Sequence, residues 1–306
     1  MKKITLKTGA LILALMFTFP VFSQVVLKFN FKKGDMFKQN ISVNMDMTQK
    51  VMGQDINVNL ILTSNATVEV KDVKNAIYTL EMKYKEMKMN TTISGIGNLS
   101  FDSNTPEDVA TAQDLGPMLK AIVDKPVEIV VTETGKVESI KGVDKFVEAM
   151  LNSLDANMPD AAKQQLISQF GSQFSDENFK TLFSQNAGYF YGKPVNVGDS
   201  WDYTISTNAS NFTMNVDTKV TVKSIEGNIV TLNTEGTVAT PEGYETEING
   251  MKAKVTVKGA QKGWVKIDKN TGWVVSSEIT QNASGNVEAM GMSIPLSINS
   301  TTSIVE

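Results

Sequence analysis

The sequence predicts an α+β fold dominated by β-strands, in which two duplicated units of long, curved antiparallel strands form a partial barrel and a central helical segment packs on them. Three observations predict this: strand-like alternation over long stretches, short motifs that recur in order, and helical spacing between the two sets of motifs. The expected parts are a signal peptide over 1–23, a first β-rich repeat with an inserted helix over 24–155, a helical connector over 156–190 and a second β-rich repeat over 191–306.

The chain opens with a segment typical of a cleavable signal peptide. Lys2, Lys3 and Lys7 form a basic start, an apolar run follows over 10–22, and the residues before Gln24 suit cleavage at that point. The run is shorter than the roughly 20 residues that span a bilayer, so an uncleaved anchor is the less favoured alternative. Because no cysteine follows the cleavage point, we expect an exported protein, periplasmic or extracellular, that is not a lipoprotein and has no transmembrane segment in its mature chain.

The charge and composition of the chain exclude several partners. All 29 basic residues are lysine, and removing the three lysines of the leader leaves 26 against 33 acidic residues, a net charge of −7. Nucleic acids and anionic membrane surfaces select basic surfaces that carry arginine, so we expect neither as a partner. The absence of arginine also argues against a dedicated phosphate site.

The chain has no histidine and no cysteine, which excludes most catalytic designs. Catalytic triads need histidine, nucleophilic thiols need cysteine, and most zinc sites need one or both. We therefore predict a non-enzymatic protein with no catalytic residues, no cofactor and no metal site. A hydrolase that uses two carboxylates is the remaining enzymatic alternative, because glycoside hydrolysis needs no other side chain.

Three short motifs occur twice, in the same order along the chain. The pairs are 31–42 with 195–206, 68–80 with 220–232, and 130–139 with 267–276. The first pair shares a Gly-Asp-x-aromatic core and a closing Ile-Ser. The offsets of 164, 152 and 137 residues shrink along the chain, so the first copy carries extra residues between its motifs. Ordered repetition of this kind indicates an internal duplication.

Each copy contains the pattern of a long strand. Apolar residues occupy alternate positions over 56–70 in the first copy and over 212–222 in the second. Alternation with a period of two places one face of a strand in the core. Because strands of this length exceed the usual five or six residues, we expect them to curl into a strongly bent sheet or partial barrel.

The repeated Gly-Asp pairs at 34–35 and 198–199 are predicted to be turns rather than reactive sites. Glycine and aspartate both favour tight turns, and a strand pattern follows each pair directly. Phe37 and Trp201 are then expected to anchor these strands in the core. The segment 268–272 matches the first part of a calcium-binding loop, but it lacks the later acidic ligand, so we expect a turn there too.

Helical patterns cluster between the two copies. Start signals lie at Thr105, Pro159 and Ser175, and apolar residues at helical spacing predict a further helix around Phe146. The aromatic segment 188–194 leads into the second copy, and we expect it to cover an edge of the core. These elements form the central helical segment that packs on the sheet.

Methionine and phenylalanine supply most of the candidate ligand-binding positions. Met-x-Met pairs occur at 45/47, 87/89 and 290/292. Because methionine adapts to irregular apolar space, these pairs suit either core packing or the wall of an apolar cavity, and a Cu(I) site is the least favoured alternative. The candidate apolar lining comprises Met45, Met47, Leu60, Leu62, Met214, Phe170, Phe179 and Phe183.

Two segments, GKPVNVGDSWDYTI at 192–205 and GWVKIDKNTGWV at 263–274, together with the leader, resemble an uncharacterised family of secreted bacterial proteins. That family is described only as a domain of unknown function, and its motifs bring no catalytic residues. The predicted architecture is also similar to the lipoprotein-carrier and LppX-like lipid-binding folds. This second resemblance implies a curved antiparallel sheet closed by helices around an apolar cavity.

The favoured function is an exported, non-enzymatic protein that binds or carries an apolar, lipid-like ligand in the cell envelope. Long strands with one apolar face, methionine stripes and phenylalanine-rich central helices motivate this hypothesis. The alternative is a structural or protein-interaction module of the envelope without a ligand cavity. The expected partner is thus an apolar small molecule or lipid in the first case and an envelope protein in the second.

Overall fold

The computed structural model describes residues 24–51, 53–105, 115–154, 159, 163, 175–209, 212–248 and 251–306. The expected signal peptide, most of the helix expected after Pro159 and the candidate residue Phe170 lie outside these residues. The predicted boundaries of the helical connector therefore stay predictions. In the part of the chain that is described, no helix combines the length and the apolar character needed to cross a membrane.

Strands make up most of the described chain. In the range predicted for the first copy, the strands of the large sheet are β2 (Met36–Val51), β3 (Gln54–Lys74), β4 (Ile77–Ile93), β5 (Gly97–Asp102), β6 (Val127–Thr132) and β7 (Val137–Lys141). The second contains β9 (Ser200–Ala209), β10 (Phe212–Glu226), β11 (Ile229–Ala239), β12 (Glu245–Ile248), β13 (Met251–Asp268), β14 (Val274–Ala289) and β15 (Met292–Val305). The remaining elements are β1 (Val25–Val26), β8 (Pro194–Val195), α1 (Leu115–Ala121), α2 (Val143–Asn152), α4 (Asp176–Ser184) and a 3₁₀ helix (Gln185–Tyr189).

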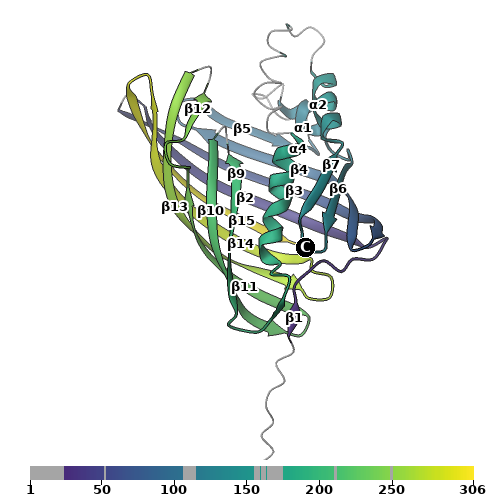
Figure 1. The fold of residues 1–306 in the computed structure, drawn as a ribbon. Helices are drawn as coiled ribbons and strands as arrows, with labels where there is room; N and C mark the ends of the chain where they lie inside the picture. Colours follow the sequence, from purple (N-terminus) through teal and green to yellow (C-terminus); the bar gives the residue numbers. More distant parts are fainter. Residues whose placement is uncertain are drawn as a thin grey trace, which may run out of the picture.

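Thirteen of the described strands form one antiparallel sheet. Its main path runs β7-β6-β4-β3-β2-β15-β14-β13-β11-β10-β9, with β5 beside β4 and β12 beside β13. The two copies meet where β15 pairs with β2, so they share a single sheet, which curves into a trough (Figure 1). The edge strands β7 and β9 do not pair with each other, so the sheet stays open. The predicted fold class, β-dominated with few helices, is confirmed.

Helix α4 lies over the concave face of the sheet, between its two edges (Figure 1). It contacts both edge strands, β7 and β9. Its start agrees with the sequence, because Ser175 Oγ accepts a hydrogen bond from the Asn178 backbone N–H at 3.2 Å, as a helix N-cap does. The helix expected around Phe146 is α2, and Phe146 itself is 0% exposed. The prediction that central helices pack on the sheet is confirmed for these two.

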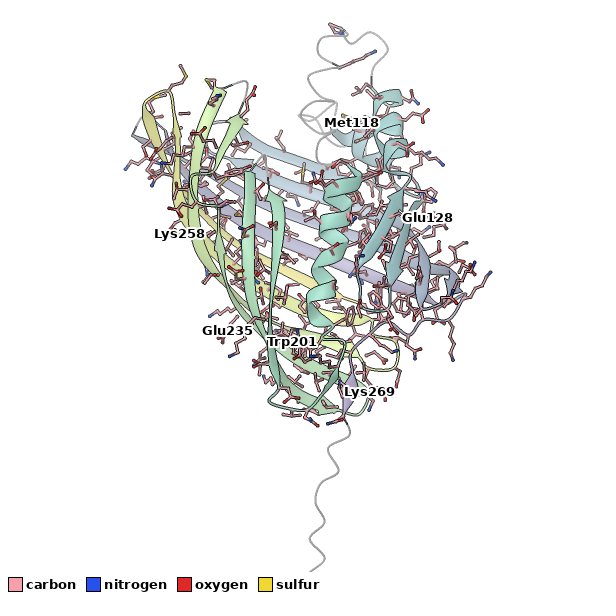
Figure 2. The ribbon with its side chains drawn as sticks, viewed as in Figure 1. Met118, Glu128, Trp201, Glu235, Lys258 and Lys269 are labelled. Carbon is pink, nitrogen blue, oxygen red and sulfur yellow. The ribbon has the colours of Figure 1, made fainter. Side chains whose placement is uncertain are left out.

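The alternation predicted for the long strands is also confirmed. Val68 and Val70 on β3 and Val220 and Val222 on β10 all point into one apolar core. Polar residues occupy the convex face, and Figure 2 shows Glu235 pointing away from the trough. The alternation therefore sets a buried concave face against a solvated convex face, as expected for a sheet with one side in water.

Glycines allow the sharp bend of the second copy. Four inward positions on β11, β13 and β14 carry no side chain, and a Cβ at any of them would collide with a carbonyl oxygen of the neighbouring strand: Gly236, Gly259, Gly263 and Gly285. Glycine within a strand commonly marks such a close approach of two backbones. These four positions therefore require glycine, because any larger residue would push the neighbouring strands apart.

The first Gly-Asp pair forms a turn, as predicted. The Gly34 backbone N–H donates to the Val70 carbonyl, and the Val70 N–H donates back to the Asp35 carbonyl, each at 2.9 Å. The Asp35 carboxylate accepts a hydrogen bond from the Lys32 backbone N–H at 2.7 Å. Phe37 follows and is buried in the core. The turn thus pins the start of β2 to the far end of β3.

The second Gly-Asp pair repeats this geometry bond for bond. The Gly198 N–H donates to the Val222 carbonyl and the Val222 N–H to the Asp199 carbonyl, again at 2.9 Å. The Asp199 carboxylate accepts from the Asn196 N–H at 2.8 Å, and Trp201 is buried. The prediction that each Gly-Asp pair forms a turn at the start of a long strand, with Phe37 or Trp201 anchoring that strand in the core, is confirmed.

The segments that open the two predicted copies pair with each other and close the lower end of the trough. Val25 pairs with Val195 between β1 and β8. The Phe29 N–H donates to the Glu133 carbonyl at 2.7 Å, and the Asn30 N–H donates to the Thr271 carbonyl at 2.9 Å. An aromatic cluster fills the space behind them: Phe29, Phe31, Phe37, Tyr78, Phe190 and Trp273. One end of the concave face is therefore packed solid.

We predict that Asp199→Ala lowers the free energy of unfolding by about 1 kcal/mol, because the backbone N–H of Asn196 loses its acceptor. Asp35→Ala should behave alike, since its turn is the same. Urea denaturation measures both. Asp202→Ala, at an exposed position of β9, is the control and should change stability less. Unchanged stability of Asp199→Ala would contradict the turn assignment.

Candidate functional site

A cavity of about 430 Å³, partly open to solvent, lies on the concave face of the sheet. It separates two apolar clusters. The larger one holds the aromatic residues at the lower end of the trough, and the smaller one includes Val238, Val255 and Leu296. Residues of both clusters face the cavity, among them Phe183 and Ile279 from the larger and Met214 and Val216 from the smaller. The volume falls within the range of about 300–1,000 Å³ that is usual for small-molecule sites.

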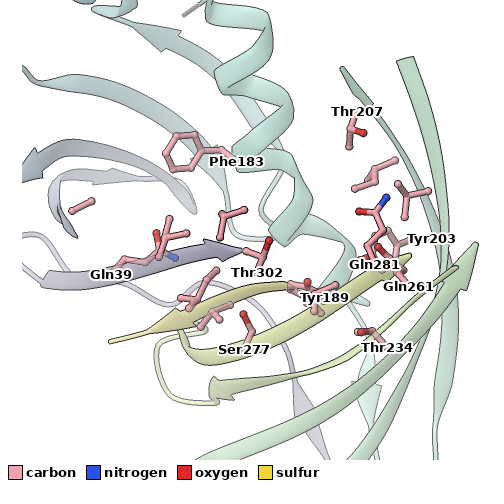
Figure 3. Close-up of a pocket in the computed structure, with 18 of the residues that line it drawn as sticks. Gln39, Phe183, Tyr189, Tyr203, Thr207, Thr234, Gln261, Ser277, Gln281 and Thr302 are labelled. Carbon is pink, nitrogen blue, oxygen red and sulfur yellow. The ribbon is translucent and has the colours of Figure 1, made fainter. Parts of the chain in front are cut away.

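The wall opposite the sheet consists of α4 and the 3₁₀ helix. Figure 3 shows Phe183 reaching from α4 toward the strands that carry Gln39 and Thr302. Tyr189 continues this wall from the 3₁₀ helix and meets Tyr203 of β9 edge to face, with ring centroids 6.2 Å apart. The helical segment therefore covers the cavity with aromatic side chains.

The 3₁₀ helix is fixed to the edge strand β9 by two contacts. The Trp201 indole N–H donates a hydrogen bond to the Gly188 carbonyl at 2.9 Å. The ring of Tyr203 packs so closely on Gly188 that a Cβ there would collide with it. The predicted core-edge segment 188–194 is therefore partly a cavity wall, because Tyr189 lines the cavity while Phe190 is buried in the core.

A row of uncharged polar side chains crosses the apolar face at the level of the cavity. The Gln261 amide donates a hydrogen bond to Thr218 Oγ1 at 2.6 Å. The hydroxyl of Tyr203 is hydrogen-bonded both to Thr218 and to Tyr189. Gln281 lies directly opposite Gln261 on the next strand. Of these groups, Tyr189, Tyr203, Gln261 and Gln281 line the cavity (Figure 3), and they form a polar band on its wall. Further polar residues of the lining lie outside this band: Gln39, Thr207, Ser277 and Thr302.

Thr234 on β11 is the exception in this band. Its side chain lines the cavity and is 1% exposed to solvent, yet its hydroxyl has no hydrogen-bond partner among the described residues. Its cross-strand neighbours on the same face are Val220 and Gly263, which offer no polar side chain. A buried hydroxyl without a partner is unfavourable, so this atom marks a place where a partner would stabilise the protein.

No formal charge lies on the cavity wall: none of the described lining residues is Asp, Glu or Lys. Three tyrosines line it, and burial raises the pKa of each phenol: to about 12 for Tyr84, and upward also for Tyr189 and Tyr203. All three are therefore protonated at neutral pH. Elsewhere in the described chain, no group of three or more acidic, histidine or cysteine side chains is placed to hold a metal ion.

Of the residues predicted as apolar lining, Phe183 and Met214 face the cavity. Phe179 does not; it is buried in the core, where its ring meets Phe146 edge to face with centroids 5.8 Å apart. Met47 packs against the smaller apolar cluster. Phe170 lies outside the described residues, as noted above.

Met45, Leu60 and Leu62 lie on the concave face beside the cavity and are half-buried. Met45 pairs directly with Leu60, and Leu62 pairs with the lining residue Val43. The structure therefore places these three residues on the predicted face of the sheet, next to lining residues but outside the lining of the cavity. Whether they contact a ligand stays a prediction.

The third Met-x-Met pair is not part of any core, so the core-packing interpretation of that pair is wrong. Met290 is 75% exposed and Met292 is 49% exposed, because the two residues flank the tip of the β14–β15 hairpin. A positive φ of 53° at Met290 forms the turn itself. Residues two positions apart in the chain point to the same face only when both lie in one strand, and Met290 and Met292 are separated by a turn.

Sequence reasoning missed the polar part of the lining. Gln261 and Thr234 occupy inward positions on strands whose remaining inward residues are apolar or glycine, and Gln281 shares the inward face of β14 with the buried Ser277. One signal was available: on β13 the inward series contains glutamine between Gly259 and Gly263, with valines further along on both sides. A polar residue between two glycines in an apolar stripe indicates a hollow in the sheet.

The fold and the site together define a class of protein: an open, curved antiparallel sheet that encloses an uncharged cavity beneath a helical cover. A family model described as "Family of unknown function (DUF6263)" matches residues 75–274, which is more than half of the 306-residue chain. The chain therefore belongs to this family. The expected membership of an uncharacterised family is confirmed. No curated protein matches the sequence.

Three solved structures are similar in part. A lipovitellin structure, titled for its lipid–protein interactions, is 8% identical with a TM-score of 0.48, and the match covers 90% of this chain but only 25% of the lipovitellin chain. An outer membrane channel from Pseudomonas putida F1 is 5% identical with a TM-score of 0.26, covering 90% and 97% of the two chains. Salmonella typhi OmpF in complex with daunomycin is 6% identical with a TM-score of 0.23, covering 90% and 99%. With every TM-score below 0.5, these likenesses carry no weight for function.

We predict that stability falls in alkaline solution because of the buried phenols. Burial raises the pKa of Tyr84 from 10.0 to about 12, so the unfolded chain releases this proton at a lower pH than the folded protein does. The stabilisation that comes from the protonated Tyr84 phenol is fully present below pH 10 and is lost as the pH rises toward about 12.

Urea unfolding of the wild type and of Tyr84→Phe, at neutral pH and near pH 11, tests this expectation. The variant should lose less stability across that interval, because it has no phenol at this position to ionise. Tyr191→Phe, at an exposed tyrosine, controls for the loss of a hydroxyl. An equal loss in the wild type and in Tyr84→Phe would contradict the prediction.

Proposed function

We propose that this protein is an exported, non-enzymatic binding protein that holds or carries an apolar, lipid-like ligand in the cell envelope. The observation that carries the proposal is the cavity of about 430 Å³ between two apolar clusters on the concave face of the sheet. The leader typical of a signal peptide supports the envelope location.

The lining supports an apolar ligand. Aliphatic and aromatic side chains face the space from both sides, with Ile41, Val43 and Ile304 on the sheet and Phe183 on α4. Transfer of an alkyl chain from water to such a wall is favourable by roughly 25 cal/mol per Å² of apolar surface. A cavity that contains no ligand forfeits these contacts, because a void offers the wall no partner atoms.

The chemistry of the wall supports binding rather than catalysis. The polar groups of its described lining are amides, hydroxyls and protonated phenols, and none of these residues is a histidine, lysine or carboxylate that could activate a nucleophile. The carboxylate-dependent hydrolase would need two acids facing each other in a cleft. None of the described residues that line the cavity is an acid.

A second candidate function, an envelope protein-interaction module, is favoured by one different observation. Exposed methionines gather where two hairpins end side by side: Met251 is 42% exposed, Met292 49% and Met290 75%. The register places them together, because Ala253 pairs with Ala289 and Ala289 pairs with Met292. Methionine is common at surfaces that accept varied partners.

Ligand binding is tested with delipidated protein and a matched pair of variants. Ile279→Phe adds bulk on the cavity wall, and Ile298→Phe makes the same change beside the smaller apolar cluster, away from the cavity. An apolar ligand should raise the Tm of the wild type. Ile279→Phe should weaken binding about tenfold, as expected for crowding of a packed site, while Ile298→Phe should bind normally.

Mass spectrometry of the protein purified from its native envelope identifies the ligand. Under the binding hypothesis, apolar molecules co-purify with the wild type and are depleted from Ile279→Phe. Co-purification of another protein, with no small molecule and no Tm shift with any lipid, would favour the interaction module instead.

A further inference from the structure

We infer that the cavity selects uncharged amphipathic molecules, in which an alkyl chain carries one hydroxyl, carbonyl or amide group, and that Thr234 hydrogen-bonds this group together with the glutamines of the polar band. The inference rests on the proposed binding function and names the ligand class of that same cavity. Three properties of the wall carry it: an unpartnered hydroxyl, a pair of amides opposite each other, and the absence of charge among the described lining residues.

The first property is the hydroxyl of Thr234. This side chain is 1% exposed, lines the cavity and has no hydrogen-bond partner in the described part of the chain. Gly263 lies directly opposite it, and Gly236 lies two residues further along β11 on the same face. The directly opposite positions, Val220 and Gly263, therefore carry no side chain that could hydrogen-bond to it, and the diagonal neighbours Thr218 and Gln261 bond to each other instead. A ligand atom in the cavity is the partner that the wall leaves room for.

The second property is the amide pair. Gln261 and Gln281 face each other across β13 and β14, at the level of Thr218 on β10. Thr218 accepts the hydrogen bond from the Gln261 side-chain amide at 2.6 Å, which fixes the orientation of that amide. Amide groups both donate and accept, so they suit a hydroxyl, carbonyl or amide of the ligand equally well.

The third property is the lack of charge. Placing a carboxylate, phosphate or ammonium in an apolar enclosure is strongly unfavourable unless an opposite charge pairs with it. None of the described lining residues can supply one, because no lysine, aspartate or glutamate faces the space. Tyr84, Tyr189 and Tyr203 stay protonated at neutral pH. The wall thus accepts hydrogen-bonding groups but rejects ions.

The size of the cavity determines which test ligands fit inside it. Its volume of about 430 Å³ corresponds to roughly fourteen groups the size of a water molecule. A ten-carbon chain with a small polar end group fits within it. Decanol, decanamide, decane, decanoate and decylammonium share this chain and differ only at the end group.

The experiment measures displacement of the uncharged fluorescent probe phenylnaphthylamine from delipidated full-length protein at pH 7. Decanol and decanamide should compete about three- to tenfold better than decane, because one neutral hydrogen bond strengthens binding by about that factor. They should compete at least about tenfold better than decanoate and decylammonium, which must lose their charge to enter. Decanoate or decane competing as well as decanol would overturn the inference.

Thr234→Val tests the role assigned to the hydroxyl. The substitution keeps the shape of the side chain and should abolish most of the advantage of decanol over decane. It should also raise the Tm of the ligand-free protein, because an unsatisfied buried hydroxyl is removed. An unchanged decanol-to-decane ratio in Thr234→Val would overturn the inference.

Thr240→Val is the matched control. This threonine is also buried, but its hydroxyl donates to the Val255 carbonyl and accepts from the Val257 N–H, each at 3.1 Å, and it does not line the cavity. Its replacement should lower the Tm and leave the decanol-to-decane ratio unchanged. A Tm loss in Thr234→Val as large as that in Thr240→Val would show that the Thr234 hydroxyl already has a partner.

Failure of the inference and failure of the proposed function give different results. If the cavity binds no apolar molecule, phenylnaphthylamine does not bind and Ile279→Phe changes nothing, so no ligand competes. If the cavity binds apolar molecules without regard to their end group, the probe binds, Ile279→Phe weakens it, and decane competes as well as decanol.

Discussion

The fold depends on covering the concave face of a sheet that does not close. The edge strands β7 and β9 leave a gap, and α4 contacts both of them across it. The 3₁₀ helix continues this cover and is held to β9 by the Trp201 indole and by the packing of Tyr203 on Gly188. Without this cover, the apolar residues between the edges would face water. The cavity exists because the cover spans the trough without filling it.

The interior is apolar at both ends of the trough and polar in the middle. Aromatic residues fill the lower end, and valines and Leu296 fill the other cluster. Between them, Thr218, Thr234 and Gln261 interrupt the inward stripe while glycines bring neighbouring backbones together. A continuous apolar stripe would favour stability alone, whereas an unsatisfied hydroxyl costs about 1–3 kcal/mol. The proposed ligand would offset this cost by supplying the missing hydrogen-bond partner.

Much of the fold could be predicted from the sequence because its signals are local. Period-two alternation marked the strands, and the Gly-Asp turns bond to Val70 and Val222 as the repeat requires. The site was less predictable. Phe183 and Met214 reach the cavity, but whether an apolar residue faces a void or a packed core depends on how the strands and α4 pack in three dimensions. Phe179 lies on α4 only four residues before Phe183, yet it is buried in the core. Gln261 and Thr234 were missed because a polar residue in a strand is normally assigned to the solvent-exposed face. The sequence alone does not reveal the curvature of the sheet that creates a cavity on the inner face.

The pairing of β15 with β2 has a consequence for folding kinetics. Ile304 lies opposite Ile41, so strands from opposite ends of the described chain are hydrogen-bonded in the middle of the sheet. Until β15 is in place, β2 exposes one side, and such edges template aggregation. Contacts between distant residues also form slowly, because a long loop must close first. Each copy can form its own hairpins early, but the joining of the two halves is the step that covers the exposed edges of β2 and β15.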